Sequence, residues 1–156
     1  MQKGYIAPIV MQHLRSNKGV LYGARALNEH MPPHLDKHTS DFDVYSKKPK
    51  IQAKKLEKEL DKKLGGDYFK VKKAKYPHTT KVVSKVTGET IADFTKPKEK
   101  IPQQTSIDGI NYARLRYIKR KLLRILKDRA SKYRWKKDRE ALKRIHVYEK
   151  HYGRVE

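Results

Sequence analysis

The sequence predicts an α+β fold: a small mixed sheet flanked by helices, with two further helices at the C-terminal end. Two observations predict it. Between residues 20 and 95, short strand-like segments alternate with segments of helical periodicity, and from residue 110 onward the apolar residues recur at helical spacing. We expect residues 1–100 to form an α/β core and residues 101–156 a basic helical extension packed on it, within one structural unit.

Helices and strands are expected to alternate in the first half of the chain. The clearest helix covers residues 50–64, where Ala53, Leu56, Leu60 and Leu64 are spaced by three or four and glycines follow. In chain order, the expected elements are a helix over 7–15, a strand over 20–22, a helix over 24–30, a strand over 41–45 and this helix over 50–64.

Strands and then helices are expected in the second half. Alternating apolar residues and a Thr-Gly turn predict strands over 68–71, 80–86 and 89–95. Residues 96–106 are rich in lysine and proline, so we expect an irregular linker there. Apolar spacing then predicts helices over 110–126 and 130–150, with Tyr117, Trp135 and Tyr148 as core residues.

The chain carries far more cations than anions. It has 156 residues with 39 Lys plus Arg against 17 Asp plus Glu, a net charge of +22, and residues 109–156 alone hold 17 against 5. Such a charge attracts polyanions, so we expect a nucleic acid partner. A membrane surface competes as a polyanion, but no apolar run approaches the roughly 20 residues that cross a bilayer, and no signal-peptide pattern is present. A cytoplasmic, nuclear or virion-interior location is expected.

The absence of cysteine limits the chemistry of any site. It excludes disulfides, thiolate zinc sites and cysteine nucleophiles. A metal must then be held by oxygen or imidazole, and Mg²⁺ is the natural candidate where carboxylates converge. His30, His34 and His38 are spaced by four, but two prolines interrupt any helix that would align them, which argues against a histidine metal site.

Two acidic residues on one expected strand are candidate metal ligands. Asp41 and Asp43 are separated by one residue, so both carboxylates leave the same face of a strand. Neighbouring carboxylates repel and raise each other's pKa unless a cation lies between them. Asp93, on another strand with apolar neighbours, could supply a third ligand.

A strand-to-helix turn upstream is a candidate phosphate site. It covers residues 22–28 and begins Tyr22-Gly23-Ala24-Arg25. A helix N-terminus offers free N–H groups and partial positive charge, and Gly23 lets the backbone approach a phosphate closely.

The order of these motifs resembles the DNA polymerase beta-like nucleotidyltransferase superfamily. That pattern has an apolar-Gly-small motif, an acid-x-acid strand and a single acid on a later strand. The corresponding segments here are 22–24, 40–44 and 91–94, and 133–138 is similar to an Arg-x-x-Lys-Asp helix of minimal members. The resemblance covers residues 20 to 145. One departure is Ala24, where the superfamily usually has Gly or Ser.

The resemblance implies transfer of a nucleoside monophosphate from a nucleoside triphosphate to a hydroxyl, with two Mg²⁺ ions. Asp41 and Asp43 would hold both ions, and Asp93 would bind the ion that activates the attacking hydroxyl. The implied nucleotide-binding residues are Gly23, Ala24, Arg25, Ser40 and Lys81. RNA, including a tRNA end, is the expected acceptor, and a protein hydroxyl stays open.

Basic residues of the C-terminal helices are candidates for contacts with nucleic acid phosphates: Arg114, Arg116, Arg120, Arg124, Lys132 and Arg134. Tyr5, Tyr45 and Tyr152 are candidates for stacking on bases. Two alternatives to an enzyme remain. One is a non-catalytic basic nucleic-acid-binding protein with a degenerate transferase fold. The other is a structural protein that neutralises packaged nucleic acid or ribosomal RNA.

Overall fold

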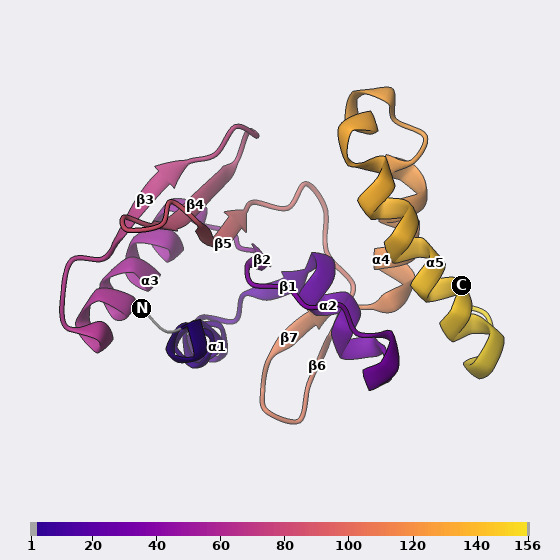
Figure 1. Cartoon of the computed structure of the whole chain (residues 1–156), viewed down its shortest axis with the longest axis horizontal. Coiled ribbons are helices and arrows are strands. Elements are labelled where there is room, and N and C mark those ends of the chain that lie inside the picture. The colour runs from indigo at the N-terminus through magenta and orange to yellow at the C-terminus, as the bar shows by residue number, and fades with distance from the viewer. Residues whose placement is uncertain (1–2, 156) are drawn as a thin grey trace.

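The computed structural model describes residues 3–155, which form helices around one mixed sheet (Figure 1). The helices are α1 (Ile6–Asn17), α2 (Gly23–His30), α3 (Pro49–Leu64), α4 (Leu115–Ile125) and α5 (Trp135–Tyr152). The strands are β1 (Val20–Tyr22), β2 (Phe42–Tyr45), β3 (Phe69–Lys73), β4 (Thr79–Ser84), β5 (Thr90–Thr95), β6 (Gln103–Thr105) and β7 (Asn111–Ala113). The predicted α+β fold with C-terminal helices is therefore confirmed.

The sheet has seven strands in the order β3-β4-β5-β2-β1-β7-β6. The pairs β2–β5 and β1–β7 are parallel, and the remaining neighbours are antiparallel, so the sheet is mixed. β2 and β5 lie at its centre, side by side and in the same direction. Residues on the same face of these two strands are therefore brought together although they are about fifty positions apart in sequence.

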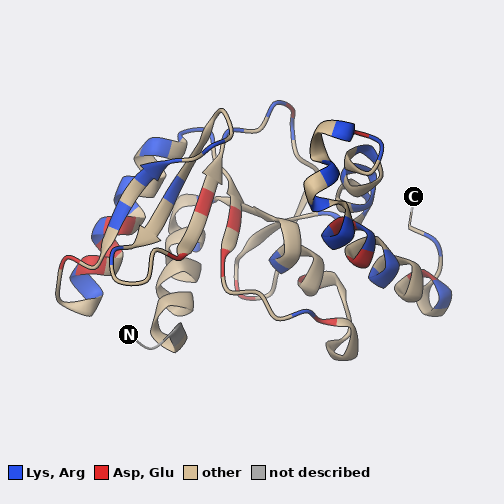
Figure 2. Cartoon of the chain, turned by 45° about the horizontal axis from the view of Figure 1, so that its top comes forward, with Lys and Arg blue, Asp and Glu red and all other residues tan. Residues whose placement is uncertain are grey.

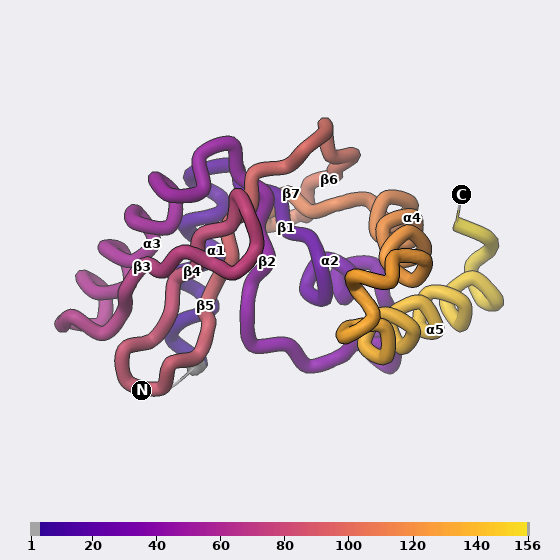
Figure 3. The backbone as a smooth tube through the Cα atoms, turned by 90° about the horizontal axis from the view of Figure 1, so that it is seen from above, coloured from indigo at the N-terminus to yellow at the C-terminus, as the bar shows by residue number. Residues whose placement is uncertain are grey.

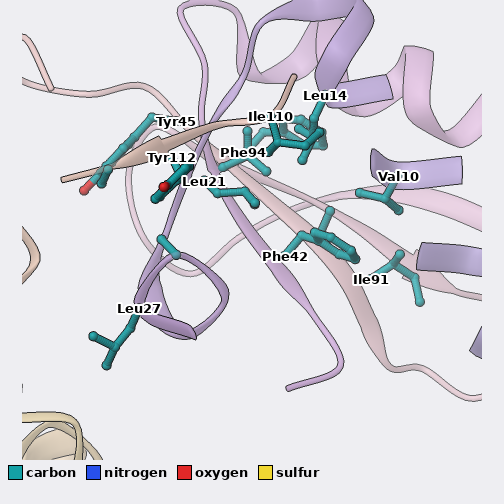
Figure 4. Packing of buried hydrophobic residues seen from close by; sticks show 14 of the residues in the cluster. Val10, Leu14, Leu21, Leu27, Phe42, Tyr45, Ile91, Phe94, Ile110 and Tyr112 are labelled. Atoms are coloured by element: carbon teal, nitrogen blue, oxygen red, sulfur yellow. The ribbon is translucent and has the colours of Figure 1, made fainter. Parts of the chain in front are cut away.

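Helices α1 and α3 cover one face of the strands β3, β4, β5 and β2, and α4 and α5 lie beyond the other face (Figures 1 and 3). Period-two alternation decides which residues enter the core: Phe42 and Phe94 are buried, together with Val10 and Leu14 of α1 (Figure 4). Each such side chain stabilises the fold by roughly 1.5–3 kcal/mol. The opposite face of β2 and β5 carries Asp43 and Asp93 beside the buried side chains of Tyr45 and Ile91.

Helix α3 follows the predicted apolar stripe. Ala53, Leu56 and Leu60 are buried, and Leu64 is partly buried against the same core. The helix ends at Gly65, which has a left-handed φ of 74° and donates its N–H to the carbonyl of Asp61. This packing fixes the back of the sheet and leaves its other face open.

The expected helix over residues 110–113 and the irregular linker over 96–106 are wrong in part. β6 and β7 form a hairpin there, and α4 begins only at Leu115. Ile110, just before β7, and Ala113, within it, are both buried, and their spacing of three residues resembled that of a helix. Asp108-Gly109, with Gly109 at a φ of 83°, is a common hairpin turn and was the overlooked signal.

Two smaller differences concern the C-terminal region. Residues 129–134 form a 3₁₀ helix, which the side chain of Asp128 caps, and α5 begins after it at Trp135. Trp135 is half-exposed rather than central to the core, and its indole N–H donates to the carbonyl of Ile125. Among residues 3–155, no helix combines the length and apolar character needed to cross a membrane.

Candidate active site

Two carboxylates meet at the centre of the open face of the sheet. Asp43 of β2 and Asp93 of β5 are direct partners in the parallel register, so their side chains leave the same face in adjacent strands. Asp41 lies immediately before β2, not in it as expected, and still joins the pair. Each of the three offers one carboxylate oxygen, and these oxygens all lie within 4.8 Å of one another. In Figure 2 acidic segments lie side by side on neighbouring strands of the sheet.

The electrostatics of this cluster favour a cation. Burial, followed by the charges of Asp41 and Asp93, raises the pKa of Asp43 to about 7. Burial also raises the pKa of Asp93, although Lys81, its register partner on β4, opposes the shift. The Oδ1 atom of Asp93 is buried and has no hydrogen-bond partner among the described residues. Three converging carboxylates with an orphaned oxygen are the donor set that Mg²⁺ prefers, so these residues fit the implied metal.

The raised pKa of Asp43 predicts that stability depends on pH. The carboxyl binds its proton more tightly in the folded state, so without divalent ions the protein should lose stability as the pH rises from about 4 to 7. Asp43→Asn removes this cost. We expect the variant to exceed the wild type by on the order of 2–4 kcal/mol at pH 8 and to match it near pH 4. Urea unfolding in EDTA measures both values; equal stabilities at pH 8 would contradict the prediction.

Gly23 brings the β1–α2 turn against these carboxylates. Tyr22 pairs with Asp43 across β1 and β2, and Gly23 follows with a φ of 70°, a conformation that L residues rarely adopt. A Cβ at this position would collide with the carboxylate of Asp43. Two separate features therefore favour glycine at this position: its left-handed backbone conformation and its close contact with Asp43, a candidate metal ligand.

The acidic cluster lies in a cleft of about 850 Å³ between the sheet and the C-terminal helices. Sheet residues form one wall, the 74–79 turn borders it, and α4 with residues 131–137 forms the other wall. This volume is in the range of sites for small molecules and cofactors. The cleft walls also carry five cations around the acids: Lys81, Lys98, Lys121, Arg134 and Lys137.

The residues expected to bind nucleotide fall into two groups. Gly23 and Lys81 line the cleft, whereas Ala24, Arg25 and Ser40 are not among its lining residues. The Arg25 guanidinium lies 3.6 Å from the centroid of the Phe42 ring and donates to the backbone carbonyls of Asp41 and Thr39. Arg25 therefore supports the segment that carries Asp41.

Lys121 of α4 is a cleft residue that sequence reasoning missed. Its Nζ donates to the hydroxyl of Tyr45 at 2.7 Å and lies 4.3 Å from the centroid of the Tyr22 ring. Burial, followed by the charge of Arg134, lowers the pKa of Lys121 to about 8. The two tyrosine rings are stacked at 3.8 Å, and the Tyr45 hydroxyl is also hydrogen-bonded to Tyr117.

Tyr45 was expected to be free to stack on bases, and this is wrong because it is buried at 8% exposure in that stack. A signal was present, since Tyr45 follows Asp43 by two residues and therefore shares its face of β2. Tyr117, expected in the core, is half-buried and lines the cleft. Tyr5 and Tyr152 are exposed as expected.

Among the basic residues expected to contact nucleic acid, only Arg134 lines the cleft, where it makes a bidentate ion pair with Asp138. Arg114 donates to the carbonyl of Gln103 at the start of α4. The others are exposed outside the cleft: Arg116, Arg120, Arg124 and Lys132. His30 is hydrogen-bonded to the carbonyl of Ala113, and residues 3–155 contain no histidine metal cluster.

A mixed sheet with three acids at its centre and a glycine turn beside them defines a DNA polymerase beta-like nucleotidyltransferase fold. The chain belongs to the poly(A) polymerase catalytic subunit family, whose model matches residues 8–131. No curated protein matches the chain significantly.

Solved structures are similar to the whole described fold. The polyadenylate synthase of Megavirus matches with a TM-score of 0.80 and 25% identity over 97% of this chain. This chain spans 32% of that protein's length. Two Helicobacter pylori structures share the fold at 16% identity. JHP933 matches with a TM-score of 0.59 over 96% of this chain and 65% of its own chain. A candidate nucleotidyltransferase matches with a TM-score of 0.55 over 96% of this chain and 68% of its own chain.

Proposed function

We propose that the protein transfers AMP from ATP to the 3′ hydroxyl of RNA. The observation that carries the proposal is the meeting of Asp43 and Asp93 in register on adjacent parallel strands, with Asp41 beside them in a cleft. Family membership supports nucleotidyl transfer, and the name of the similar Megavirus protein supports ATP as the nucleotide. The net charge of +22 favours a polynucleotide acceptor over a neutral one.

The three carboxylates would hold two divalent ions. Bound Mg²⁺ would supply charge stabilisation at the α-phosphate and a more acidic attacking hydroxyl. The strand order supports a placement of the two substrates on opposite sides of Asp43. Gly23 lies on the β1 side of Asp43 and opens room for the triphosphate, whereas Asp93 lies on the β4 side, next to the acceptor hydroxyl. Positioning and electrostatics then carry the reaction, with no protein nucleophile.

Lys121 is the cleft cation best placed to bind triphosphate oxygens. It is held by Tyr45 and Tyr22, so little side-chain entropy is lost when it donates to a phosphate. We expect Lys121→Met to raise the KM for ATP roughly 10- to 100-fold, because a hydrogen bond to a charged group contributes about 1.5–3 kcal/mol. The KM for ATP of the wild type should also rise above pH 8, as the amine loses its proton.

Steady-state kinetics at varied ATP checks this expectation. Lys127→Met is the matched control, because Lys127 is exposed just beyond the end of α4 and does not line the cleft. If both variants have the wild-type KM for ATP, Lys121 does not bind the triphosphate.

The function is tested by incubating the protein with Mg²⁺, an RNA oligonucleotide and each labelled nucleoside triphosphate in turn. We expect ATP to extend the RNA, and expect no extension in EDTA or with a 3′-deoxy terminus. Label on the protein instead of the RNA would indicate a protein hydroxyl acceptor. RNA binding without incorporation of any nucleotide would favour the non-catalytic basic binder.

A further inference from the structure

A second cavity, of about 380 Å³, opens at the rim of the sheet, where α3 and β4 begin and β3 and β5 end. Four lysines line it, Lys48, Lys50, Lys73 and Lys96, and none of its lining residues is acidic. All four lysines are exposed, and no ion pair joins any of them to another residue within 3–155. The cavity is therefore lined by cations whose charge no neighbouring acid offsets among the described residues.

The remaining lining is largely apolar. Pro49 and Ile51 of the first turn of α3 contribute to it, and Ile51 is 56% exposed although it is apolar. The methylene stems of the lysines extend the same surface. An apolar floor with a cationic rim suits a nucleotide, whose base can lie on the floor while its phosphate meets the ammonium groups. A small inorganic anion would use the charges alone and leave the floor uncovered.

The cavity borders the acidic cleft at the end of the sheet. His78 and Thr79 line both of them. Lys96 follows Asp93 by three residues along β5 and its end, about 10 Å at the rise of a strand, so its side chain leaves the opposite face of the sheet, where α3 packs. The cavity lies on the β4 side of Asp43, which is also the side of Asp93, and Gly23 lies on the opposite side. An acceptor strand whose 3′ hydroxyl reaches Asp93 would therefore reach the lysines by passing His78 and Thr79, round the end of the sheet where β4 begins.

We propose that this lysine-rimmed cavity binds the acceptor strand just upstream of its 3′ end, with the lysines on the phosphodiester backbone. The inference rests on the proposed function, because that function assigns the acceptor end to Asp93. It places the first protein contacts of the strand at the rim formed by α3 and the β3–β4 hairpin. The exposed arginines of α4 would then contact only more distant nucleotides.

The test compares Lys73→Ala/Lys96→Ala with a matched control, Lys62→Ala/Lys63→Ala, which removes the same charge from exposed positions at the far end of α3. The acceptors are a diadenylate, too short to fill the cavity, and an oligoadenylate of about 15 nucleotides. We expect the cavity variant to raise the KM for the long acceptor roughly tenfold and to leave the KM values for diadenylate and ATP unchanged. The control should leave all three unchanged.

Three results would overturn the proposal: an unchanged KM for the long acceptor, an equal rise for both acceptors, or a rise in the KM for ATP instead. A binding measurement distinguishes failure of the cavity proposal from failure of the proposed function. Fluorescence anisotropy of labelled oligoadenylate at increasing salt gives the slope of the logarithm of the association constant against the logarithm of salt concentration. Because two phosphate contacts are removed, this slope should be shallower than that of the wild type by about 1.4 in the cavity variant, and unchanged in the control. If no acceptor is extended, the proposed function fails, and an unaltered slope would then also exclude the cavity.

Discussion

Asp43→Asn should abolish nucleotidyl transfer while RNA binding persists. The substitution removes one negative charge from the centre of the acidic cluster and replaces one ligand oxygen with an amide NH₂. Charge stabilisation by bound divalent ions contributes several kcal/mol to such reactions, so the rate should fall on the order of 10³-fold or more. Single-turnover incorporation of labelled AMP into an RNA oligonucleotide measures the loss, and anisotropy with the same RNA measures binding.

Asp36→Asn is the control for this variant, because Asp36 is exposed, lies outside the cleft and carries the same charge. It should keep wild-type incorporation. Asp93→Asn should resemble Asp43→Asn, since the two residues face each other across β2 and β5. If Asp43→Asn retains more than about a tenth of the wild-type rate, a difference under about 1.4 kcal/mol, the carboxylate cluster does not carry the chemistry.

Gly23→Ala is expected to have the second largest effect. The new Cβ must occupy a backbone with a φ of 70° and would collide with the carboxylate of Asp43. The backbone strain should lower the free energy of unfolding by about 1–2 kcal/mol. Displacing the carboxylate should in addition lower the turnover rate about 100-fold, because misplacement by about 1 Å has this effect in catalytic sites.

Gly88→Ala separates these two effects. Gly88 has a φ of 75°, and a Cβ there would meet no atom within 4 Å. Both variants should lose similar stability in urea unfolding, and only Gly23→Ala should lose activity. Equal activities in the two variants would show that the contact between Gly23 and Asp43 is not functional.

The central strands β2 and β5 could be predicted from the sequence because apolar and polar residues alternate along them. Phe42, Val44, Ala92 and Phe94 are buried, and Asp43 faces the opposite side, as a period of two requires. The β6–β7 hairpin escaped prediction because each of its strands has only three residues, too few to establish a period. Tertiary packing on β1, rather than local pattern, makes β7 a strand.

The acids of the site could be predicted for a related reason. Asp41 and Asp43 are close in sequence, and Asp93 lies in a strand whose apolar pattern marks it as central. Lys121 could not be found this way, because its place in the cleft depends on how α4 docks beside Tyr45, 76 positions earlier. Arg25 is adjacent to the glycine motif, but its side chain turns toward Phe42 and away from the cleft.

Crystals grown with Mn²⁺ and a non-hydrolysable ATP analogue would test the metal site most directly. We predict anomalous peaks between the carboxylates of Asp41, Asp43 and Asp93, with metal–oxygen distances near 2.1 Å, as for Mg²⁺. The triphosphate should lie on the Gly23 side of these peaks. Nucleotide bound in the cleft with no metal peak between the three carboxylates would contradict the claim that these acids share divalent ions.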